Sequence, residues 1–459
     1  MAAEGLWNRH LCHGPNTGIR CLRALSFFFL ARPFFMSRPE QQRSPVAVFT
    51  KTTCPTRPSR SREEGRRARA GGTMHFDVII LGAGASGLVC AGWCARRGRT
   101  VAVLDHGGKA ARKVLASGGG RCNCTNMGIA ATDYRCANPH FVKSALARFS
   151  PVDFLEWAHG GGVATREEDG GKVFCRDGAP VLARFLEKEA RSAGARLILG
   201  TGLREARKEG DGFIVDTDAG TLRAAALVLA LGGRSWPGLG ATGAGYALAE
   251  GFGLGLTSLR PGLTPLLAPS QLVGFCRELA GVSLPVRLSG PCDVSGDLLF
   301  THRGISGPAV LDASLFWREG LPLVIDFLSG LDLDAALADA ERLEIKNALA
   351  RYLPRRLAAG LCRHFGLAGP VAELARKARR GLARNLAAFS FLPAGAEGWA
   401  KAEVTLGGVD TTGLSSKTLE ATAVPGLYVI GELLDVTGRL GGFNLHWAFA
   451  SGFAAGQVA

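Results

Sequence analysis

The stretch Phe76–Asp105, FDVIILGAGASGLVCAGWCARRGRTVAVLD, decides the fold of this chain. It opens with a continuous apolar run, as a parallel strand buried on both faces does. A G-x-G-x-x-G motif follows, and then a segment of helical length, a second apolar run and an acidic residue. Such a motif between a strand and a helix, in a unit of about 30 residues with an acid about 20 residues downstream, predicts a dinucleotide-binding α/β fold.

Each glycine of the motif has a physical role. Gly82 permits the tight turn, Gly84 lets the backbone approach a pyrophosphate, and Gly87 lets the helix pack closely on the strand. The helix begins near Ala85 and Ser86, and its free N–H groups and positive dipole end attract phosphate.

The acid at the end of the second apolar run, Asp105, can accept hydrogen bonds from both hydroxyls of a ribose. A carboxylate at this position favours FAD or NAD over NADP, because it would repel a 2′-phosphate. The alternative for the whole stretch is a glycine-rich turn in an α/β fold that binds no nucleotide.

Length and charge limit the remaining possibilities. A chain of 459 residues has room for two or three domains. Its net charge of +15 is uneven: thirteen Lys/Arg and four Asp/Glu give residues 1–73 a charge of +9, which leaves +6 for the rest. We therefore expect a small-molecule substrate and regard nucleic acid as an unsupported partner.

The twelve cysteines show no disulfide or zinc spacing, so we expect a reduced compartment, a cytoplasmic location and no metal site. No apolar run approaches the ~18 residues that a membrane span requires. The sequence leaves the oligomeric state open.

Residues 1–73 do not resemble a domain, since they are rich in Arg, Pro and Ser and lack periodicity. We expect a disordered extension, or an upstream start codon with the native protein beginning at Met74. A transit peptide is the alternative, because Arg-rich, acid-poor N-termini have that character.

A glycine-rich loop over residues 107–126 (GGKAARKVLASGGGRCNCTN) follows the first unit. It can lie against a cofactor, with Lys113 and Arg121 available as cations for phosphate or substrate. Cys122 and Cys124 make poor zinc ligands, because no second pair accompanies them.

The middle of the chain contains further sheet strands and then an insertion. Leu203 follows an expected strand, at a position where the protein backbone commonly contacts the adenine of a bound dinucleotide. Another expected strand leads into Gly232. Proline-punctuated short strands begin near residue 259. We therefore expect a first cofactor-binding part over 74–258 and an inserted domain over 259–401, strand-rich to about 330 and helical over about 331–392. The basic residues of its helices are expected to form a solvated face: Arg376, Lys377, Arg379, Arg380 and Arg384.

Nucleotide-fold character returns over residues 402–459. A short apolar strand ends at Gly431 and Glu432, and a further glycine pair precedes a helix from about Leu445. A helix that points its N-terminus back into the site could hold the ribityl chain and pyrimidine edge of a flavin. The alternative is a plain strand–turn–helix that closes the sheet. The residues expected around the flavin here are Gly441, Gly442, Phe443 and Asn444.

Four motifs together resemble one flavoprotein family. They are GAGASG (82–87), KVLASGGGRCNCTN (113–126), GDLLFTHRGISGP (296–308) and GLYVIGELLDVTGRLGGFNLHWAFASG (426–452). The family comprises NAD(P)/FAD-dependent oxidoreductases, including the BaiN-type enone reductase and aminoacetone oxidase-like proteins. The resemblance covers residues 74–459. It implies FAD and a Rossmann-like domain that is split in sequence by a β-barrel-like and helical insert.

The resemblance also implies roles for individual residues. Carried over by motif, the glycines of GAGASG and Asp105 hold ADP, and the ribityl region meets Gly431 and Glu432. The residues implied along the pyrophosphate and flavin are Gly119, Gly120, Arg121, Cys122 and Asn123. The residues implied beside the isoalloxazine ring are Gly442, Phe443 and Asn444.

In a flavoenzyme the cofactor carries the redox chemistry, and the protein positions substrate and moves protons. His302 and His446 are candidate proton donors or bases, each with a structural role as the alternative. We predict an FAD-dependent oxidoreductase that reduces a conjugated carbonyl compound or oxidises an amine, with NAD(P)H as a transient reductant. The alternative from another class is a flavin-bound, RNA-associated protein without turnover.

Overall fold

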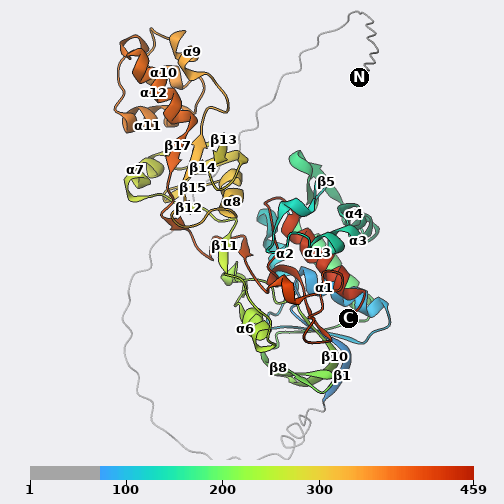
Figure 1. Cartoon of the computed structure of the whole chain (residues 1–459). Helices are drawn as coiled ribbons and strands as arrows, with labels where there is room; N and C mark the ends of the chain where they lie inside the picture. Colours follow the sequence, from blue (N-terminus) through green and yellow to red (C-terminus); the bar gives the residue numbers. More distant parts are fainter. Residues whose placement is uncertain (1–72) are drawn as a thin grey trace, which may run out of the picture. The chain divides into compact units, whose positions relative to one another are not determined.

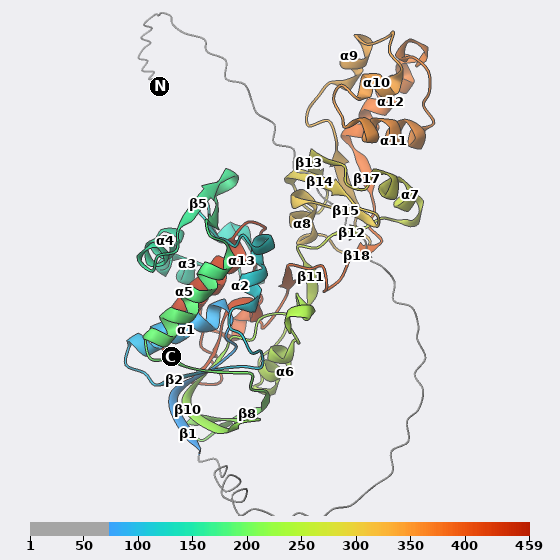
Figure 2. The ribbon, with the colours of Figure 1, turned by 180° about the vertical axis from the view of Figure 1, so that it is seen from behind.

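The computed structural model describes residues 73–459, shown in Figures 1 and 2. The predictions made for residues 1–72 lie outside the described part of the chain. No helix within the described residues is long and apolar enough to cross a membrane.

A seven-stranded sheet forms the centre of the cofactor-binding part. Its order is β7-β2-β1-β10-β9-β8, with β20 beside β10. The pairs of β1 with β2 and β10, of β2 with β7, and of β10 with β20 are parallel, whereas β8, β9 and β10 form an antiparallel meander. The strands are β1 (Met74–Leu81), β2 (Val101–Asp105), β7 (Arg196–Leu199), β8 (Leu203–Glu209), β9 (Gly212–Thr217), β10 (Gly220–Leu229) and β20 (Leu427–Val429).

The quoted N-terminal stretch forms the expected β–α–β unit. The apolar run at the end of β1 is fully buried, as a strand covered on both faces must be. Helix α1 (Ala85–Arg96) begins after Gly84 and is followed by β2. The last helix of the chain, α13 (Phe443–Gly456), packs along α1, and α5 (Ala179–Ser192) also contacts it.

Shorter elements complete this part of the molecule. The strands are β3 (Asn123–Asn126), β4 (Tyr134–Arg135), β5 (Thr165–Glu168), β6 (Lys172–Cys175) and β21 (Thr437–Gly438). The helices are α2 (Arg112–Ala116), α3 (Lys143–Arg148), α4 (Pro151–Gly160) and α6 (Ala244–Gly251). Strands β3, β5 and β6 form a small antiparallel sheet, and β4 pairs with β21.

The insertion leaves and re-enters through one pair of strands. Strand β11 (Arg260–Gly262) pairs antiparallel with β19 (Val404–Leu406). Between them lies a second seven-stranded sheet of order β17-β16-β13-β14-β15-β12-β18. Its strands are β12 (Leu266–Leu267), β13 (Ser283–Ser289), β14 (Val294–Phe300), β15 (Gly304–Ser306), β16 (Leu323–Asp326), β17 (Phe389–Phe391) and β18 (Gly395–Ala396).

Helices α7 (Ser270–Leu279) and α8 (Pro308–Ser314) pack on this second sheet. Four more helices lie between β16 and β17, and their cluster is visible in Figure 1 beyond the strands. They are α9 (Leu333–Ala338), α10 (Ile345–Leu349), α11 (Arg355–Phe365) and α12 (Arg376–Ala387).

One local expectation in this region differs from the structure. The helical part expected over about 331–392 includes a strand at its end, because Phe389–Phe391 pairs with β16 and buries its two aromatic rings. An apolar run this short does not reveal its period. Ser306 ends β15, and Gly307 occupies the N-cap position of α8 without a side-chain cap.

The contact between the first and last helices generates a stability prediction. A Cβ added at Gly452 in α13 would lie 2.4 Å from the carbonyl oxygen of Ser86 in α1. We expect Gly452→Ala to lower the free energy of unfolding by about 1–3 kcal/mol, because the two helices must separate. Gly381→Ala is the matched control, since its Cβ meets nothing within 4 Å in helix α12. It should raise stability by roughly 0.5–1 kcal/mol. Chemical denaturation measures both; equal effects would contradict the packing argument.

Candidate functional site

A cavity of about 490 Å³ lies at the carboxyl ends of β1 and β2. Its wall comes from the GAGASG turn, the loop of residues 112–123, the segment after β10, the C-terminal segment and the base of the insert. The sequence-predicted residues that line it are Gly82, Gly84, Ala85, Ser86, Asp105, Lys113, Gly119, Arg121, Asn123, Gly232, Glu432, Gly441, Gly442 and Asn444.

Other predicted cofactor residues lie behind the wall or away from it. Gly87 faces the turn after β1, where an added Cβ would be 2.0 Å from the oxygen of Gly82, and Gly431 packs against Ser86. Leu203 begins β8. The predicted cofactor residues that do not line the cavity are Gly87, Gly120, Cys122, Leu203, Gly431 and Phe443, and their roles stay predictions.

The backbone around the GAGASG turn forms a cradle that is free of side chains. Gly84 has an ordinary φ of −78°, and an added Cβ would meet nothing within 4 Å. Gly119, across the cavity, also has open space at its Cβ position. Gly82 has a φ of +109°, and its Cβ would lie 2.3 Å from the oxygen of Ala230, so only glycine fits the turn. This open backbone beside a helix N-terminus fits a pyrophosphate group.

Asp105 is held rigidly at the end of β2. One carboxylate oxygen accepts a hydrogen bond from the Ala83 amide at 2.9 Å. The other accepts from the Gly107 amide at 2.7 Å and from Arg112 at 3.0 Å. Arg112 also donates to the carbonyl of Leu239 at 2.6 Å. Arg112 thus links Asp105 to Leu239, another residue that lines the cavity, a link that the sequence did not indicate because Leu239 is remote in the chain.

Lys113 and Glu432 meet across the cavity. The Lys113 ammonium lies 2.7 Å from Glu432 and donates to the Ser235 hydroxyl at 3.0 Å. Glu432 accepts further hydrogen bonds from the Ser235 hydroxyl at 2.8 Å and from the Thr405 amide at 3.0 Å. This network joins helix α2, the segment after β10, strand β19 and the segment after β20. The two predicted residues therefore act together at one place.

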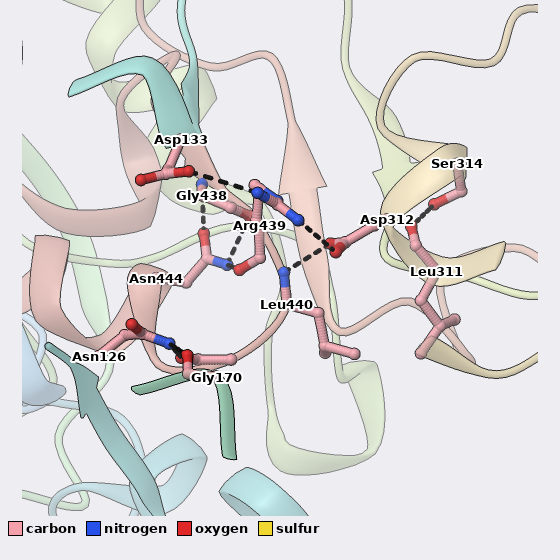
Figure 3. Close-up of polar contacts among 11 residues, drawn as sticks. Asn126, Asp133, Gly170, Leu311, Asp312, Ser314, Gly438, Arg439, Leu440 and Asn444 are labelled. Atoms are coloured by element: carbon pink, nitrogen blue, oxygen red, sulfur yellow. Dashed lines mark hydrogen bonds and ion pairs between the residues drawn. The ribbon is translucent and has the colours of Figure 1, made fainter. Parts of the chain in front are cut away.

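Arg439, which also lines the cavity, lies between two aspartates (Figure 3). Its guanidinium is 3.5 Å from Asp133 and 3.6 Å from Asp312. The Leu440 amide donates to Asp312 at 2.7 Å, and Asn444 bonds both the amide and the carbonyl of Gly438 at 2.8 Å. These bonds fix the backbone that leads into Gly441 and Gly442.

Asp312 connects the insert to this wall, since it belongs to helix α8. Its side chain is largely buried, and burial raises the pKa of its carboxyl, opposed by the Leu440 amide and by Arg439. An apolar cluster of Leu263, Leu315, Val404 and Leu406 lies at the base of the insert. The position of the loop over residues 438–442 therefore depends on the insert.

Two further cations, Lys172 and Arg121, border the cavity. A Cβ on Gly441 would lie 3.5 Å from the side chain of Lys172, which starts strand β6. Arg121 stacks on the ring of Phe174, 4.1 Å from its centroid, and pairs with Glu168. Sequence reasoning missed Lys172 and Phe174, because only the pairing of β6 with β3 brings them to the cavity.

The two candidate histidines lie elsewhere. His302 is exposed in the insert, and His446 is fully buried in α13; neither lines the cavity. One ring nitrogen of His446 accepts from the Thr125 hydroxyl at 2.9 Å, and the other donates to the carbonyl of Phe149 at 3.0 Å. Burial lowers the pKa of His446 from 6.5 to about 4, so the ring is neutral at pH 7. This geometry favours the structural alternative for His446.

Cys122 and Cys124 are buried behind the glycine loop, next to Cys175. The hydrogen bond to Cys175 and burial both raise the pKa of Cys122 and of Cys124, so these thiols stay protonated. Within residues 73–459, no group of three or more His, Cys, Asp or Glu side chains is placed to hold a metal ion.

Comparison with known proteins places this geometry in context. The family model described as "HI0933-like protein Rossmann domain" matches residues 76–458. A protein of Escherichia coli (strain K12) named "Ribosomal RNA dihydrouridine synthase" is 42% identical over 390 residues, with 83% of this chain and 97% of that protein covered. The protein of the same name from Haemophilus influenzae is 40% identical over 394 residues, with 83% and 98% covered.

A more distant relative has a different name. The "3-dehydro-bile acid delta(4,6)-reductase" of Clostridium scindens is 30% identical over 403 residues, with 83% of this chain and 98% of that protein covered. Among solved structures, the open conformation of a flavocytochrome c3 fumarate reductase matches with a TM-score of 0.43 and 17% identity, covering 87% of this chain and 81% of that one.

The open backbone at Gly84 generates a cofactor prediction. Gly84→Val should fold normally, because the φ is ordinary and the Cβ position is empty, but its branched side chain should obstruct the pyrophosphate path. We expect the purified variant to lose bound FAD, measured by its absorbance spectrum, while its circular dichroism is unchanged. Gly160→Val, another position with open space, is the control and should stay yellow. A yellow Gly84→Val protein would show that the cofactor lies elsewhere.

The buried His446 predicts a pH dependence of stability. Its pKa is lower in the folded chain than in the unfolded chain, so unfolding takes up a proton between pH 6.5 and about 4. The contribution of neutral, buried His446 to the free energy of unfolding is therefore fully present above pH 6.5. It is lost as the pH falls towards 4. His446→Gln, which keeps a donor and an acceptor, should show a shallower loss in denaturation curves from pH 7 to 5. His302→Gln should follow the wild type; identical slopes for all three proteins would contradict the assignment.

Proposed function

This chain belongs to the HI0933-like family of FAD-binding Rossmann proteins, and from that membership we propose that it reduces a carbon–carbon double bond conjugated to a carbonyl group. The family confirms three of the sequence predictions: the Rossmann-like fold, FAD as cofactor and the FAD-dependent oxidoreductase class. The substrate and the reaction direction are our proposal.

The observation that carries the proposal is the chemistry shared by the names of the relatives. Dihydrouridine is uridine whose ring double bond, conjugated to a carbonyl, has been saturated. A delta(4,6)-reductase of a 3-dehydro-bile acid also saturates double bonds conjugated to a ketone. Both reactions add a hydride and a proton across a C=C bond next to a carbonyl. Neither name supports the amine oxidation that the sequence left open.

We take a uracil ring in RNA as the first candidate substrate. The two relatives named for this reaction are 42% and 40% identical, whereas the bile-acid reductase is 30% identical. This proposal departs from the expectation that nucleic acid is an unsupported partner, which rested on the modest net charge of residues 74–459. A free small-molecule enone is the second candidate, supported by the bile-acid reductase.

The residues of the cavity suit this chemistry. FAD, when bound, supplies the hydride, and the Gly82–Gly87 turn, Asp105 and Glu432 are the groups that would hold it. Lys172 and Arg439 are two cationic residues that line the cavity, and Lys172 lies beside Gly441. Cations there would bind the carbonyl oxygen of the substrate and stabilise the negative charge that develops on it as the double bond is reduced. NAD(P)H as the source of electrons stays a prediction.

The test measures electron transfer from the reduced protein to a candidate substrate. Under anaerobic conditions, chemically reduced protein should be reoxidised by a uridine-containing ribosomal RNA fragment or by a small cyclic enone, recorded by stopped-flow absorbance. Lys172→Met should slow reoxidation about 100-fold, because one stabilising charge is lost. Lys188→Met, an exposed lysine on α5, is the matched control and should react at the wild-type rate.

Two results would overturn the proposal. One is reduced protein that transfers no electrons to either type of substrate. The other is oxidised protein whose flavin is bleached by aminoacetone, since that reaction runs in the opposite direction.

A further inference from the structure

The positive charge of the described chain is concentrated in one segment. Residues 327–388, here called the helical segment, contain eleven Lys/Arg and six Asp/Glu, a net charge of +5. Residues 74–459 as a whole carry +6, so the remainder of this region is nearly neutral. The low average charge therefore concealed a strongly basic patch.

Helix α12 carries the densest part of this charge. Arg376, Arg380 and Arg384 are exposed and follow one another at intervals of four residues, so they form a row along one face. The opposite face holds the buried Leu382 and Leu386. We call the row, together with the exposed Lys377, the α12 basic face.

This arrangement is unfavourable for the helix itself. The basic residues begin in the first turn of α12, where the helix dipole disfavours positive charge. Like charges four residues apart repel each other as well. Asp334 pairs with Arg379 and Arg380, and within residues 73–459 it is the acidic residue that forms ion pairs with α12. Arg380 of the row thus has an acidic partner, whereas Arg376 and Arg384 form no ion pair among the described residues, so stabilisation of the helix does not explain the row as a whole.

We propose that the α12 basic face binds the phosphate backbone of an RNA substrate. This inference rests on the proposed function, because it identifies the partner of the same cavity. Successive arginines in the row are separated by about 5–6 Å at their Cβ atoms, so each can meet a separate phosphate. No residue of the helical segment lines the cavity. A ligand that engages both must be a polymer, which a free enone is not.

A second feature of the helical segment favours nucleic acid. Tyr352 is 45% exposed and lies between Arg351 and Arg355, which are also exposed. An exposed aromatic ring beside arginines is suited to stacking with an unpaired base. An anionic membrane surface fits less well, because the large apolar residues of α12, Leu382 and Leu386, are buried and leave no face to insert into lipid.

The test removes the row without disturbing the fold. In the FAD-loaded protein, Arg376, Arg380 and Arg384 are each replaced by Gln, which preserves helix propensity and relieves repulsion. The control replaces Arg204, Arg223 and Arg287 by Gln; these exposed arginines pair with nearby acids, and the change in net charge is the same. Binding of a fluorescent stem–loop fragment of ribosomal RNA with a uridine in its loop is measured from 50 to 300 mM salt.

We expect the α12 variant to bind this RNA at least about tenfold more weakly at ~100 mM salt. The slope of log affinity against log salt should fall by about 2–3, since up to three phosphate contacts are lost. The control variant should bind as the wild type does. Equal affinity and slope in all three proteins, or no RNA binding by the wild type, would overturn the inference, as would binding of α12 to phosphatidylserine vesicles in place of RNA.

A separate readout distinguishes this inference from the proposed function. Reoxidation of the reduced protein by a small cyclic enone depends on the cavity alone and should be unchanged in the α12 variant. If the wild type reduces the enone but the RNA measurements fail, the double-bond chemistry stands and the RNA surface is rejected. If it reduces neither compound but still binds RNA through α12, the proposed reaction is rejected and the surface stands.

Discussion

The close packing of the first helix on the last is the constraint on which the rest of the structure depends. Glycine at position 452 lets α13 lie against the backbone of α1, and Gly87 lets α1 lie against the turn that follows β1. Arg97, just after α1, donates to the terminal Ala459 carbonyl at 2.9 Å. Two segments almost 350 residues apart thereby form one wall. The cavity exists because the backbone after β1 and the backbone before α13 are held on the same side of the sheet.

The insert contributes to the same site without belonging to the central sheet. It enters and leaves through the paired strands β11 and β19, so its base is fixed beside the cavity. Asp312 then holds the Leu440 amide, and Thr405 holds Glu432. A substrate that entered here would meet groups from both parts of the molecule. A few hydrogen bonds thus couple the residues that line the cavity to the position of the insert.

Much of the cofactor-binding part could be predicted from local sequence, because its motifs combine chain geometry with chemistry in one short stretch. The strand, turn and acid of residues 76–105 are such a case, and the fold and FAD were confirmed. Arg112, Lys172 and Phe174 could not be predicted to line the cavity, since their positions depend on contacts between remote segments. His446 lies on a helix that is apolar on almost all sides, so periodicity could not show which way its ring points. The mean charge of residues 74–459 did not indicate the basic character of helix α12, because an average over 386 residues does not resolve a single helix.

The place of the helical segment in the second sheet has one more consequence. Strands β16 and β17 pair antiparallel, so the segment occupies the position of a hairpin turn, and its two ends are about 5 Å apart. A connection with such close ends makes few demands on the strands that flank it. These helices can therefore be lengthened, shortened or changed in charge during evolution while the cavity keeps its shape. The binding partner of the helical segment can thus diverge faster than the reaction in the cavity.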